Sequence, residues 1–207
     1  MVSRDQTPAV LGWEAFVAAR TRAIRGLTGM VLELGAGQGE NFSALTPGVQ
    51  WLGLEPSSRF RRTLAERARH AGHHQPPIAA TAEAIPLDDA SVTNVMATTV
   101  LCSVTDPGQV LQETARVLTP GGQVVLAEHV PAPTGSSARR AQRLVKPFTK
   151  FFDHGCDLTR DTEAAVHNSD LTVQDVSRFH IRVLGRLHIP FVVITAQKPA
   201  MPQHTQG

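Results

Sequence analysis

The residues with the most evident chemistry in this chain are one acid and three glycines: Glu33, Gly35, Gly37 and Gly39, spaced as Glu-x-Gly-x-Gly-x-Gly. Glycine has no Cβ, so the chain can turn tightly and a ligand can lie against the backbone. Glu40 follows, so the spacing differs from the Gly-x-Gly-x-x-Gly of dinucleotide-binding loops. A carboxylate at position 33 would repel a pyrophosphate and attract an ammonium or sulfonium group. The loop therefore predicts a site for a positively charged ligand, the alternative being a turn that binds nothing.

A second acid, Glu55, lies sixteen residues after Gly39 and ends the next apolar run, which begins at Trp51. In nucleotide-binding α/β proteins, an acid at the end of the second strand accepts hydrogen bonds from the ribose hydroxyls. Pro56 and Ser57 follow and are typical of a helix start. A glutamate that merely ends a strand is the weaker alternative behind this glycine loop. The two motifs together predict a ligand that contains a ribose.

Apolar runs and helical periodicities predict the elements that position these motifs. The expected strands cover residues 30–34, 51–55, 78–81, 91–98, 123–130, 171–182 and 187–197. The expected helices cover residues 14–27, about 40–45, 57–71, a stretch opening at Asp106-Pro107, 136–152 with an interruption near Pro147, and 159–168. In the first helix, Arg20 is expected to face outward with Arg22 and Arg25. Strand and helix alternate, which predicts an α/β fold with a doubly wound, mostly parallel sheet closed by an antiparallel C-terminal hairpin.

Residues 1–198 are expected to form one domain, because 207 residues suffice for one core and are too few for a comfortable second one. Within it, residues 136–160 combine basic and apolar side chains at helical spacing. We interpret them as a cap-like insertion over the carboxyl edge of the sheet. A solvated helix face and a weak membrane-surface contact are the alternatives. Residues 199–207 are expected to be a disordered tail.

Composition excludes several classes of protein. With 42% hydrophobic residues, 18% charged residues and a formal charge of +2, the chain is an ordinary globular one without a case for a nucleic-acid partner. It has no apolar run of membrane-spanning length, so we expect a cytoplasmic protein without a stable membrane anchor. Cys102 and Cys156 form no Cys-x-x-Cys pair, and no Cys/His group has ligand spacing along the sequence. We therefore expect no metal site.

From Val31 to Val130 the chain resembles a class I S-adenosylmethionine (SAM) methyltransferase of the UbiE or type 11 kind. Within that class, it resembles the methyltransferase-like family that includes the mammalian alkyl-thiol methyltransferases. Six blocks carry this narrower resemblance: Gly39-Glu-Asn-Phe42, Val100-Leu-Cys-Ser-Val104, Val110-Leu-Gln-Glu113, Arg116-Val-Leu-Thr-Pro-Gly-Gly122, Glu128-His-Val130 and Gly155-Cys-Asp-Leu-Thr-Arg160. The resemblance implies a seven-stranded Rossmann-like fold, SAM as methyl donor and S-adenosylhomocysteine as product.

The resemblance also assigns a donor site, residue by residue. The positions assigned to the methionine moiety come from the glycine loop: Glu33, Gly35, Ala36, Gly37 and Gly39. The ribose would be held at Glu55 and Pro56, and the adenine at Ala82, Glu83 and Ala84, through the Glu83 carboxylate and the Ala84 N–H. The floor beside the reacting methyl would be formed by Thr98 and Val100. These positions agree with the rule that ligands lie outside the carboxyl ends of parallel strands.

The acceptor side departs from the family pattern around Asp153-His154, so thiol specificity does not follow from the donor site. His129 ends a strand near the end of strand 91–98, and is the best candidate for a base or an acceptor-orienting group. It could instead cap the strand. Asp153 and His154, on the segment expected to fold over the site, are the other catalytic candidates, with an ordinary turn before Gly155 as the alternative.

The sequence thus predicts an enzyme, a SAM-dependent methyltransferase that acts by in-line displacement on a small-molecule acceptor. An apolar thiol is the favoured acceptor. The alternatives are an O- or N-methyltransferase of a small metabolite and a SAM-binding module without catalysis. A nicotinamide-dependent oxidoreductase is disfavoured by Glu33 and Glu40. The protein is expected to be a monomer or a homodimer.

Overall fold

The computed structural model describes residues 10–152, 156–184 and 187–200. The strands are β1 (Val10–Leu11), β2 (Met30–Leu34), β3 (Gln50–Leu54), β4 (Val92–Thr98), β5 (Leu118–His129), β6 (Thr172–Leu184) and β7 (Leu187–Gln197). The helices are α1 (Trp13–Arg25), α2 (Ser58–His70), α3 (Pro107–Val117), α4 (Ser137–Phe152), α5 (Thr162–His167) and the 3₁₀ helix η1 (Phe42–Ala44). The terminal residues 201–207 of the expected disordered tail lie outside the described residues.

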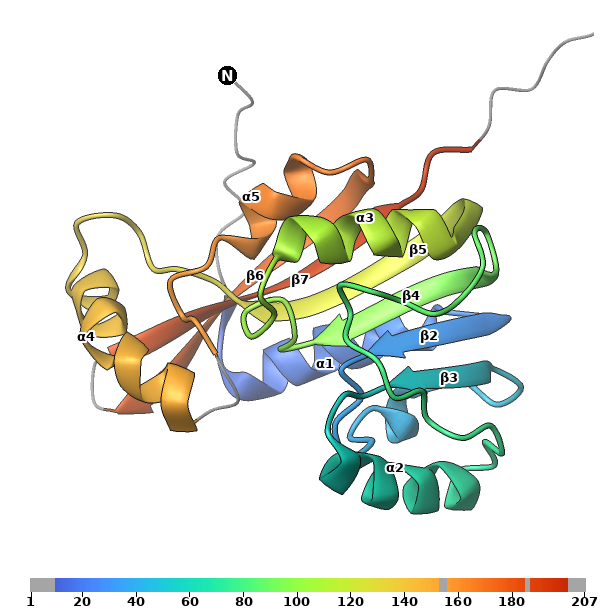
Figure 1. The fold of residues 1–207 in the computed structure, drawn as a ribbon. Coiled ribbons are helices and arrows are strands. Elements are labelled where there is room, and N and C mark those ends of the chain that lie inside the picture. The colour runs from blue at the N-terminus through green and yellow to red at the C-terminus, as the bar shows by residue number, and fades with distance from the viewer. Residues whose placement is uncertain (1–9, 153–155, 185–186, 201–207) are drawn as a thin grey trace, which may run out of the picture.

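The strands form one seven-stranded sheet in the order β1-β6-β7-β5-β4-β2-β3 (Figure 1). β2 pairs in parallel with β3 and β4, and β4 pairs in parallel with β5. β7 runs antiparallel to both β5 and β6. The expected α/β fold, mostly parallel with an antiparallel C-terminal hairpin, is therefore confirmed. The seven strands are not the expected set, because the two-residue β1 joins the sheet beside β6.

The expected strand 78–81 is not a strand. Only Ile78 pairs with the sheet, through a single bridge to Leu54. Two prolines, Pro76 and Pro77, precede it and lack the backbone N–H that a strand ladder needs. The stretch from 79 to 81 has no strand assignment and continues as a loop.

Two expected helices also differ from those found. The stretch 40–45 forms only the short 3₁₀ helix η1, because Leu45 is already extended and the chain turns at Gly48 with a φ of 91°. The helix expected over 159–168 begins at Thr162, where the side chain of Asp161 accepts a hydrogen bond from the Ala164 N–H and caps the first turn. In α4 the expected interruption near Pro147 is absent, since the helix continues to Phe152.

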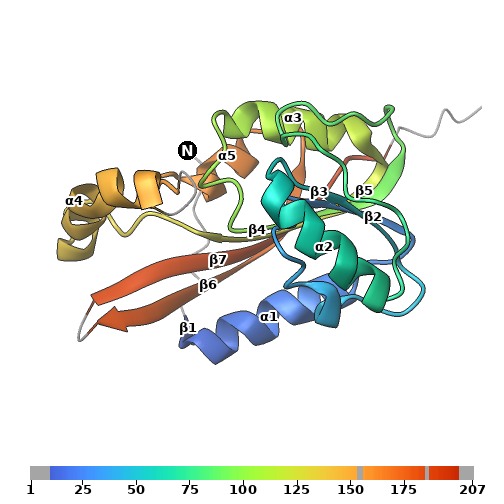
Figure 2. The ribbon, with the colours of Figure 1, turned by 60° about the horizontal axis from the view of Figure 1, so that its bottom comes forward.

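Helices cover both faces of the sheet, with α3 and α5 on one side and α1 on the other (Figure 2). In β2, Leu32 and Leu34 belong to the core that includes α3, while Val31 packs with Ile24 of α1. Successive strand residues point to opposite faces, so Glu33 emerges on the same face as Val31. The strand thus presents an acid toward α1 just before the glycine loop.

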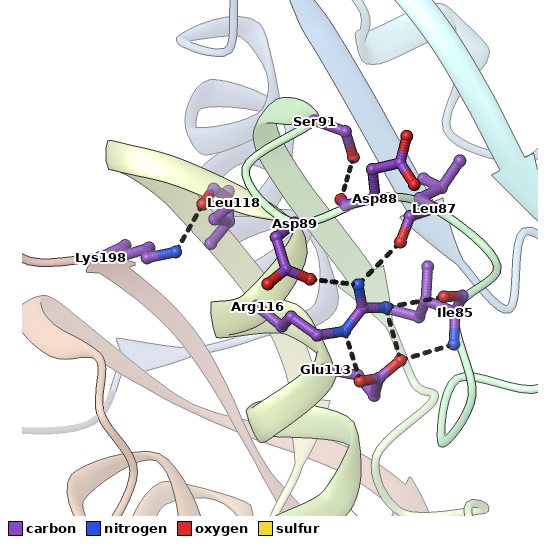
Figure 3. A network of polar contacts seen from close by, with 9 residues as sticks. All are labelled: Ile85, Leu87, Asp88, Asp89, Ser91, Glu113, Arg116, Leu118 and Lys198. Atoms are coloured by element: carbon purple, nitrogen blue, oxygen red, sulfur yellow. Dashed lines mark hydrogen bonds and ion pairs between the residues drawn. The ribbon is translucent and has the colours of Figure 1, made fainter.

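A polar network fixes the long loop between α2 and β4 (Figure 3). Arg116 of α3 pairs with Glu113 at 2.7 Å and donates to the carbonyls of Ile85, at 2.8 Å, and Leu87, at 2.7 Å. It also pairs with Asp89 at 2.9 Å. Glu113 in turn accepts a hydrogen bond from the Ile85 N–H. Because several groups of the loop share one guanidinium, the network holds the loop in place next to the expected adenine stretch.

Candidate active site

A cavity of about 660 Å³ opens where the parallel strands β2, β3 and β4 end. Its wall includes residues just beyond each strand: Gly35 after β2, Glu55 after β3 and Thr99 after β4. The volume lies within the range of small-molecule sites, and the position follows the general rule for open α/β sheets. This cavity is therefore the candidate ligand site.

Glu33 lies in the cavity wall and is almost completely buried. Its carboxylate accepts hydrogen bonds from Asn41 Nδ2 at 2.8 Å and from Trp51 Nε1 at 2.7 Å. Asn41 also donates to Thr98 Oγ1 at 3.1 Å, which links the carboxylate to the end of β4. Burial raises the pKa of Glu33 to about 7, although the Asn41 and Trp51 hydrogen bonds act in the opposite direction. The site thus holds a carboxyl group that titrates near neutral pH and that a nearby cation would ionise.

Glu55 closes the glycine loop from the neighbouring strand. One carboxylate oxygen accepts the Gly37 N–H at 2.9 Å, and the other accepts the Ser57 N–H at 2.8 Å. Each oxygen has a second lone pair, so the carboxylate can still accept hydrogen bonds from a ligand. Pro56 and Ser57 line the cavity beside it. The acid therefore shapes the loop and also presents acceptors to the cavity.

Gly35, Gly37 and Gly39 have positive φ angles of 55°, 54° and 86°. Their surroundings differ, and so do the reasons why each position requires glycine. Gly35 lines the cavity, and an added Cβ would lie 2.8 Å from Val100 Cγ2. Gly37 also lines the cavity, with no protein atom closer than 3.7 Å to an added Cβ. At Gly39 that atom would lie 2.2 Å from the Phe42 ring. Gly39 is not among the cavity-lining residues, so its assignment to the cofactor does not match its position, which is one of packing against Phe42.

Two of the three residues expected at the adenine, Ala82 and Glu83, line the cavity. Burial raises the pKa of Glu83, but hydrogen bonds from the backbone, chiefly from Thr105, outweigh it and leave the pKa below its ordinary value. The Thr105 N–H donates to Glu83 at 2.7 Å. Ala84 is not part of the lining, and its N–H already donates to the Thr81 carbonyl at 3.2 Å. The expected contact between the Ala84 N–H and a ring is therefore not supported.

Thr98, at the end of β4, and Val100, in the turn after it, line the cavity, and we call this turn the floor of the cavity. Thr99 has a φ of 55°, which is rare for a β-branched residue. The turn is held from below by Glu128 of β5, which accepts the N–H groups of Val100 at 2.8 Å and Leu101 at 3.2 Å. Burial raises the pKa of Glu128, while these hydrogen bonds lower it. A buried carboxyl thus sets the conformation of the floor.

Residues of α1 form a wall of the cavity that the sequence did not reveal. Arg20 was expected to face outward, yet it lines the cavity together with Trp13 and Phe16. Burial lowers the pKa of Arg20, and the nearby Glu33 and Glu40 counteract this. Its buried Nε has no hydrogen-bond partner among the described residues. One signal in the sequence could have placed Arg20 in the cavity wall. Phe16 lies four residues earlier, and residues at this spacing share one face of a helix.

Of the three candidate catalytic residues, only His129 lies in the part of the chain that the structure describes. His129 ends β5 as expected, but it is buried and is not among the cavity-lining residues. Its Nε2 lies 3.1 Å from the Sγ of Cys156. Asp153 and His154 lie outside the described residues, so their placement stays a prediction. The described side chains of α4 do not contribute to the cavity wall either, and the cap role of residues 136–160 also stays a prediction.

Cys102, His129 and Cys156 form a buried group of metal-ligand types. Their spacing along the sequence is not that of metal ligands, but the fold brings them together, and the expected absence of a metal site stays a prediction. A hydrogen bond with Cys156 and burial both raise the pKa of the Cys102 thiol. Burial lowers the pKa of His129, but the neighbouring Cys102 and Glu128 groups outweigh it and leave the pKa raised.

A glycine loop after one strand and an acid after the next, on a sheet of this topology, are typical of class I methyltransferases. Residues 32–126 match the family described as a methyltransferase domain. The chain is 37% identical to the human thiol S-methyltransferase TMT1B over 163 residues, which is 75% of this chain and 67% of the relative. It is 40% identical to rat TMT1B over 135 residues, 64% of this chain and 55% of that protein. The chain belongs to the family of SAM-dependent methyltransferases that includes these proteins.

Solved structures give the same fold. The geranyl diphosphate C-methyltransferase from Streptomyces coelicolor, in a complex with S-adenosylhomocysteine, has a TM-score of 0.67 at 16% identity. The similarity covers 89% of this chain and 80% of that one. Membership of the SAM-dependent methyltransferase family gives SAM as the cofactor of this chain, as expected. Among the described residues, no helix combines the length and apolar character needed to cross a membrane.

Proposed function

We propose that the cavity binds SAM and that the enzyme transfers its methyl group to an apolar small-molecule thiol. One observation carries the donor assignment: a buried acid, Glu33, and an arginine, Arg20, line the same cavity beside the glycine loop. The methionine moiety of SAM has a positive ammonium and a negative carboxylate. A site for it therefore needs one residue of each charge. The sulfonium adds a second reason for an acid at this place.

The remaining parts of the donor match the other acids of the cavity. Glu55 would accept hydrogen bonds from the ribose hydroxyls, since each of its oxygens has a free lone pair. Glu83 would accept one from the exocyclic amine of the adenine, beside Ala82. Gly37 would let the methionine moiety pass close to the backbone, because it has no Cβ there. Thr98 and Val100 would form the floor next to the methyl group.

This placement predicts that SAM affinity rises with pH through neutrality. Without ligand, the Glu33 carboxyl has a pKa of about 7, so it is largely protonated at lower pH. A bound cation requires the carboxylate and displaces that proton. If the complex holds only the carboxylate, the dissociation constant should be about tenfold higher at about pH 6 than at about pH 8. Calorimetry across this range, in buffers of different ionisation enthalpy, would measure both the affinity and the released proton.

The Glu33→Gln variant is the matched control, because it keeps the shape and removes the titrating group. SAM has an amine of its own that titrates, and comparison with this variant separates the two effects. An equal pH dependence in both proteins would contradict the role of Glu33. The same raised pKa has an opposite consequence for unliganded stability: Glu33 contributes most below its unfolded pKa, and this contribution is lost as pH rises through about 7.

The acceptor proposal rests on the relatives and on the apolar part of the cavity wall. The human and rat relatives are named thiol S-methyltransferases. In this chain Trp13 and Phe16 bring aromatic surface to the cavity, with the two rings 5.5 Å apart. Such a wall suits an apolar acceptor bound beside the donor. In the reaction, the acceptor sulfur forms a bond to the methyl carbon while the bond from that carbon to the sulfonium breaks. The thiol proton goes to solvent.

A thiol acceptor makes a distinct kinetic prediction. The reactive form is the thiolate, so kcat/KM should rise with pH and level off near the pKa of the acceptor itself. An apolar alkyl thiol and an apolar aryl thiol of lower pKa should therefore give profiles displaced by their difference in pKa. The same break point for both thiols would indicate a protein base instead. Phenols and amines of matching shape complete the test, and methylation of these without any thiol turnover would overturn the thiol proposal.

A further inference from the structure

Two thiols and an imidazole meet behind the floor of the cavity. Cys102 belongs to the turn after β4, His129 ends β5, and Cys156 lies between α4 and α5. Their side-chain ligand atoms all lie within 4.8 Å of one another, and the three residues are 1%, 8% and 2% exposed. The His129 Nδ1 is buried without a hydrogen-bond partner among the described residues. The group therefore contains three potential metal ligands and is not a single cysteine packed in the core.

Hydrogen bonds hold two of these three segments in register around this group. The Asp157 N–H donates to the Cys102 carbonyl at 2.9 Å. Arg160 donates to the carbonyls of Leu101, at 3.0 Å, and of Val104. The segment 156–160 is thereby fixed to the turn that carries Cys102. The three side chains are brought together by the fold and need little movement to share a ligand.

We propose that Cys102, His129 and Cys156 bind one zinc ion. Thiolate and imidazole are ligands that zinc prefers, with Zn–S distances of about 2.3 Å and Zn–N distances of about 2.0–2.1 Å. Tetrahedral bonds of that length place ligand atoms within about 4 Å of one another, close to the present spacing. Binding forms two Zn–S bonds and one Zn–N bond, and releases two thiol protons to solvent.

Charge favours a divalent ion over a monovalent one. Two thiolates and a neutral imidazole around Zn²⁺ have no net charge, so the complex can remain buried. Monovalent copper with the same ligands would leave one uncompensated negative charge. Three protein ligands leave a fourth position for a water or another small ligand. Ser103, whose hydroxyl lies 3.4 Å from the Cys102 sulfur, also lines the cavity.

A zinc ion at this place would join three segments that are far apart in the sequence. One of them is the turn that forms the cavity floor through Thr99 and Val100. The ion would therefore stabilise the folded state and fix that floor. The inference does not depend on which acceptor the enzyme uses.

The test uses the whole chain, unfolded in urea with reductant and refolded with or without added Zn²⁺. Refolding gives the ion access to a buried site. After removal of loose metal, elemental analysis should find one zinc per chain, and the zinc-loaded protein should melt at a higher temperature. Loading with Co²⁺ instead should produce the intense near-ultraviolet absorption of cobalt–thiolate bonds. Neither readout depends on methyl transfer.

Ligand variants decide between this site and adventitious binding. Cys102→Ser, Cys156→Ser and His129→Gln should each weaken zinc binding by more than about 100-fold, because even groups behind metal ligands cost 10–100-fold. The two serine variants should also lose the cobalt–thiolate band. His167→Ala, at an exposed histidine of α5, should bind as the unaltered protein does.

Three outcomes would overturn the proposal. The refolded chain could take up neither metal, or the cysteine variants could keep the zinc that His167→Ala loses. Thiol counting in denaturant without reductant could also find no free thiols in protein kept in air with zinc, which would show a Cys102–Cys156 disulfide instead. Because the cobalt spectrum of the unaltered chain is read directly, the test does not fail if one variant folds poorly.

Discussion

Replacing Gly37 by valine is expected to leave the protein folded and to weaken SAM binding by at least about 100-fold, which is about 2.7 kcal/mol. The nearest atom to an added Cβ, apart from the adjoining residues, is Glu40 Oε2 at 3.7 Å, so the Cβ itself meets no clash among the described residues. It would instead occupy the cavity where the donor is proposed to lie against the backbone. Calorimetric titration with SAM and with S-adenosylhomocysteine measures the loss.

The control must separate blocked binding from backbone strain. Gly37 has a φ of 54°, and a side chain in this region costs about 1–3 kcal/mol of stability. Gly72 has a φ of 88°, lies at the end of α2, and also has open space around an added Cβ. Gly72→Val should therefore lower the melting temperature to a similar degree and keep full SAM affinity. Full affinity in a folded Gly37→Val protein would remove the glycine loop from the donor site.

The parts of the fold that were predictable from sequence are those where local signals agree. β2 was expected at 30–34 and is found there, because a run that is apolar except for Glu33 is bounded by glycine on both sides. α3 begins at Pro107 after Asp106, whose side chain accepts hydrogen bonds from the first free N–H groups. In such places propensity, capping and hydrophobic period give the same answer.

The errors of the fold prediction arise where tertiary contacts override the local pattern. Residues 40–45 can form a helix by composition, but Asn41 turns inward to bind Glu33 and the chain turns back at Gly48. Ile78 has the character of a strand residue, yet the two prolines before it limit pairing to one bridge. The first outcome is not visible in a short window of sequence, whereas the second has a local signal in the two prolines.

The residues of the candidate site also fall into two groups, those that local sequence signals predict and those that only the fold brings together. Glu33 and Glu55 are adjacent to glycine and strand signals, so their place in the cavity could be predicted. Arg20 reaches the cavity from α1, an element that the glycine motif does not include. Cys102 and Cys156 are 54 positions apart in the chain, and only the packing of segment 156–160 on the turn after β4 brings them together. Such proximity depends on the fold rather than on spacing.

Replacing Glu55 by alanine is expected to weaken SAM binding by about 1.5–3 kcal/mol, which is about 10–150-fold. Two effects add. The proposed ribose hydroxyls lose a charged acceptor, and the N–H groups of Gly37 and Ser57 lose the carboxylate that holds the loop. The SAM affinity of Glu55→Gln should lie between those of the unaltered protein and Glu55→Ala. Its amide keeps one acceptor oxygen and places an N–H donor where the second oxygen was. Equilibrium titration of all three proteins with SAM gives the series.

Adenosine is the ligand that identifies which part of SAM each acid contacts. It has the ribose and the base but no methionine, so Glu55→Ala should weaken adenosine and SAM binding by similar factors. Glu33→Gln should weaken SAM binding and leave adenosine affinity unchanged, because Glu33 is proposed to face the cationic end of the donor. If Glu33→Gln weakened adenosine as much as SAM, or if Glu55→Ala affected SAM alone, the two acids would have been assigned to the wrong ends of the cavity. The paired comparison therefore tests the orientation of the donor as well as its presence.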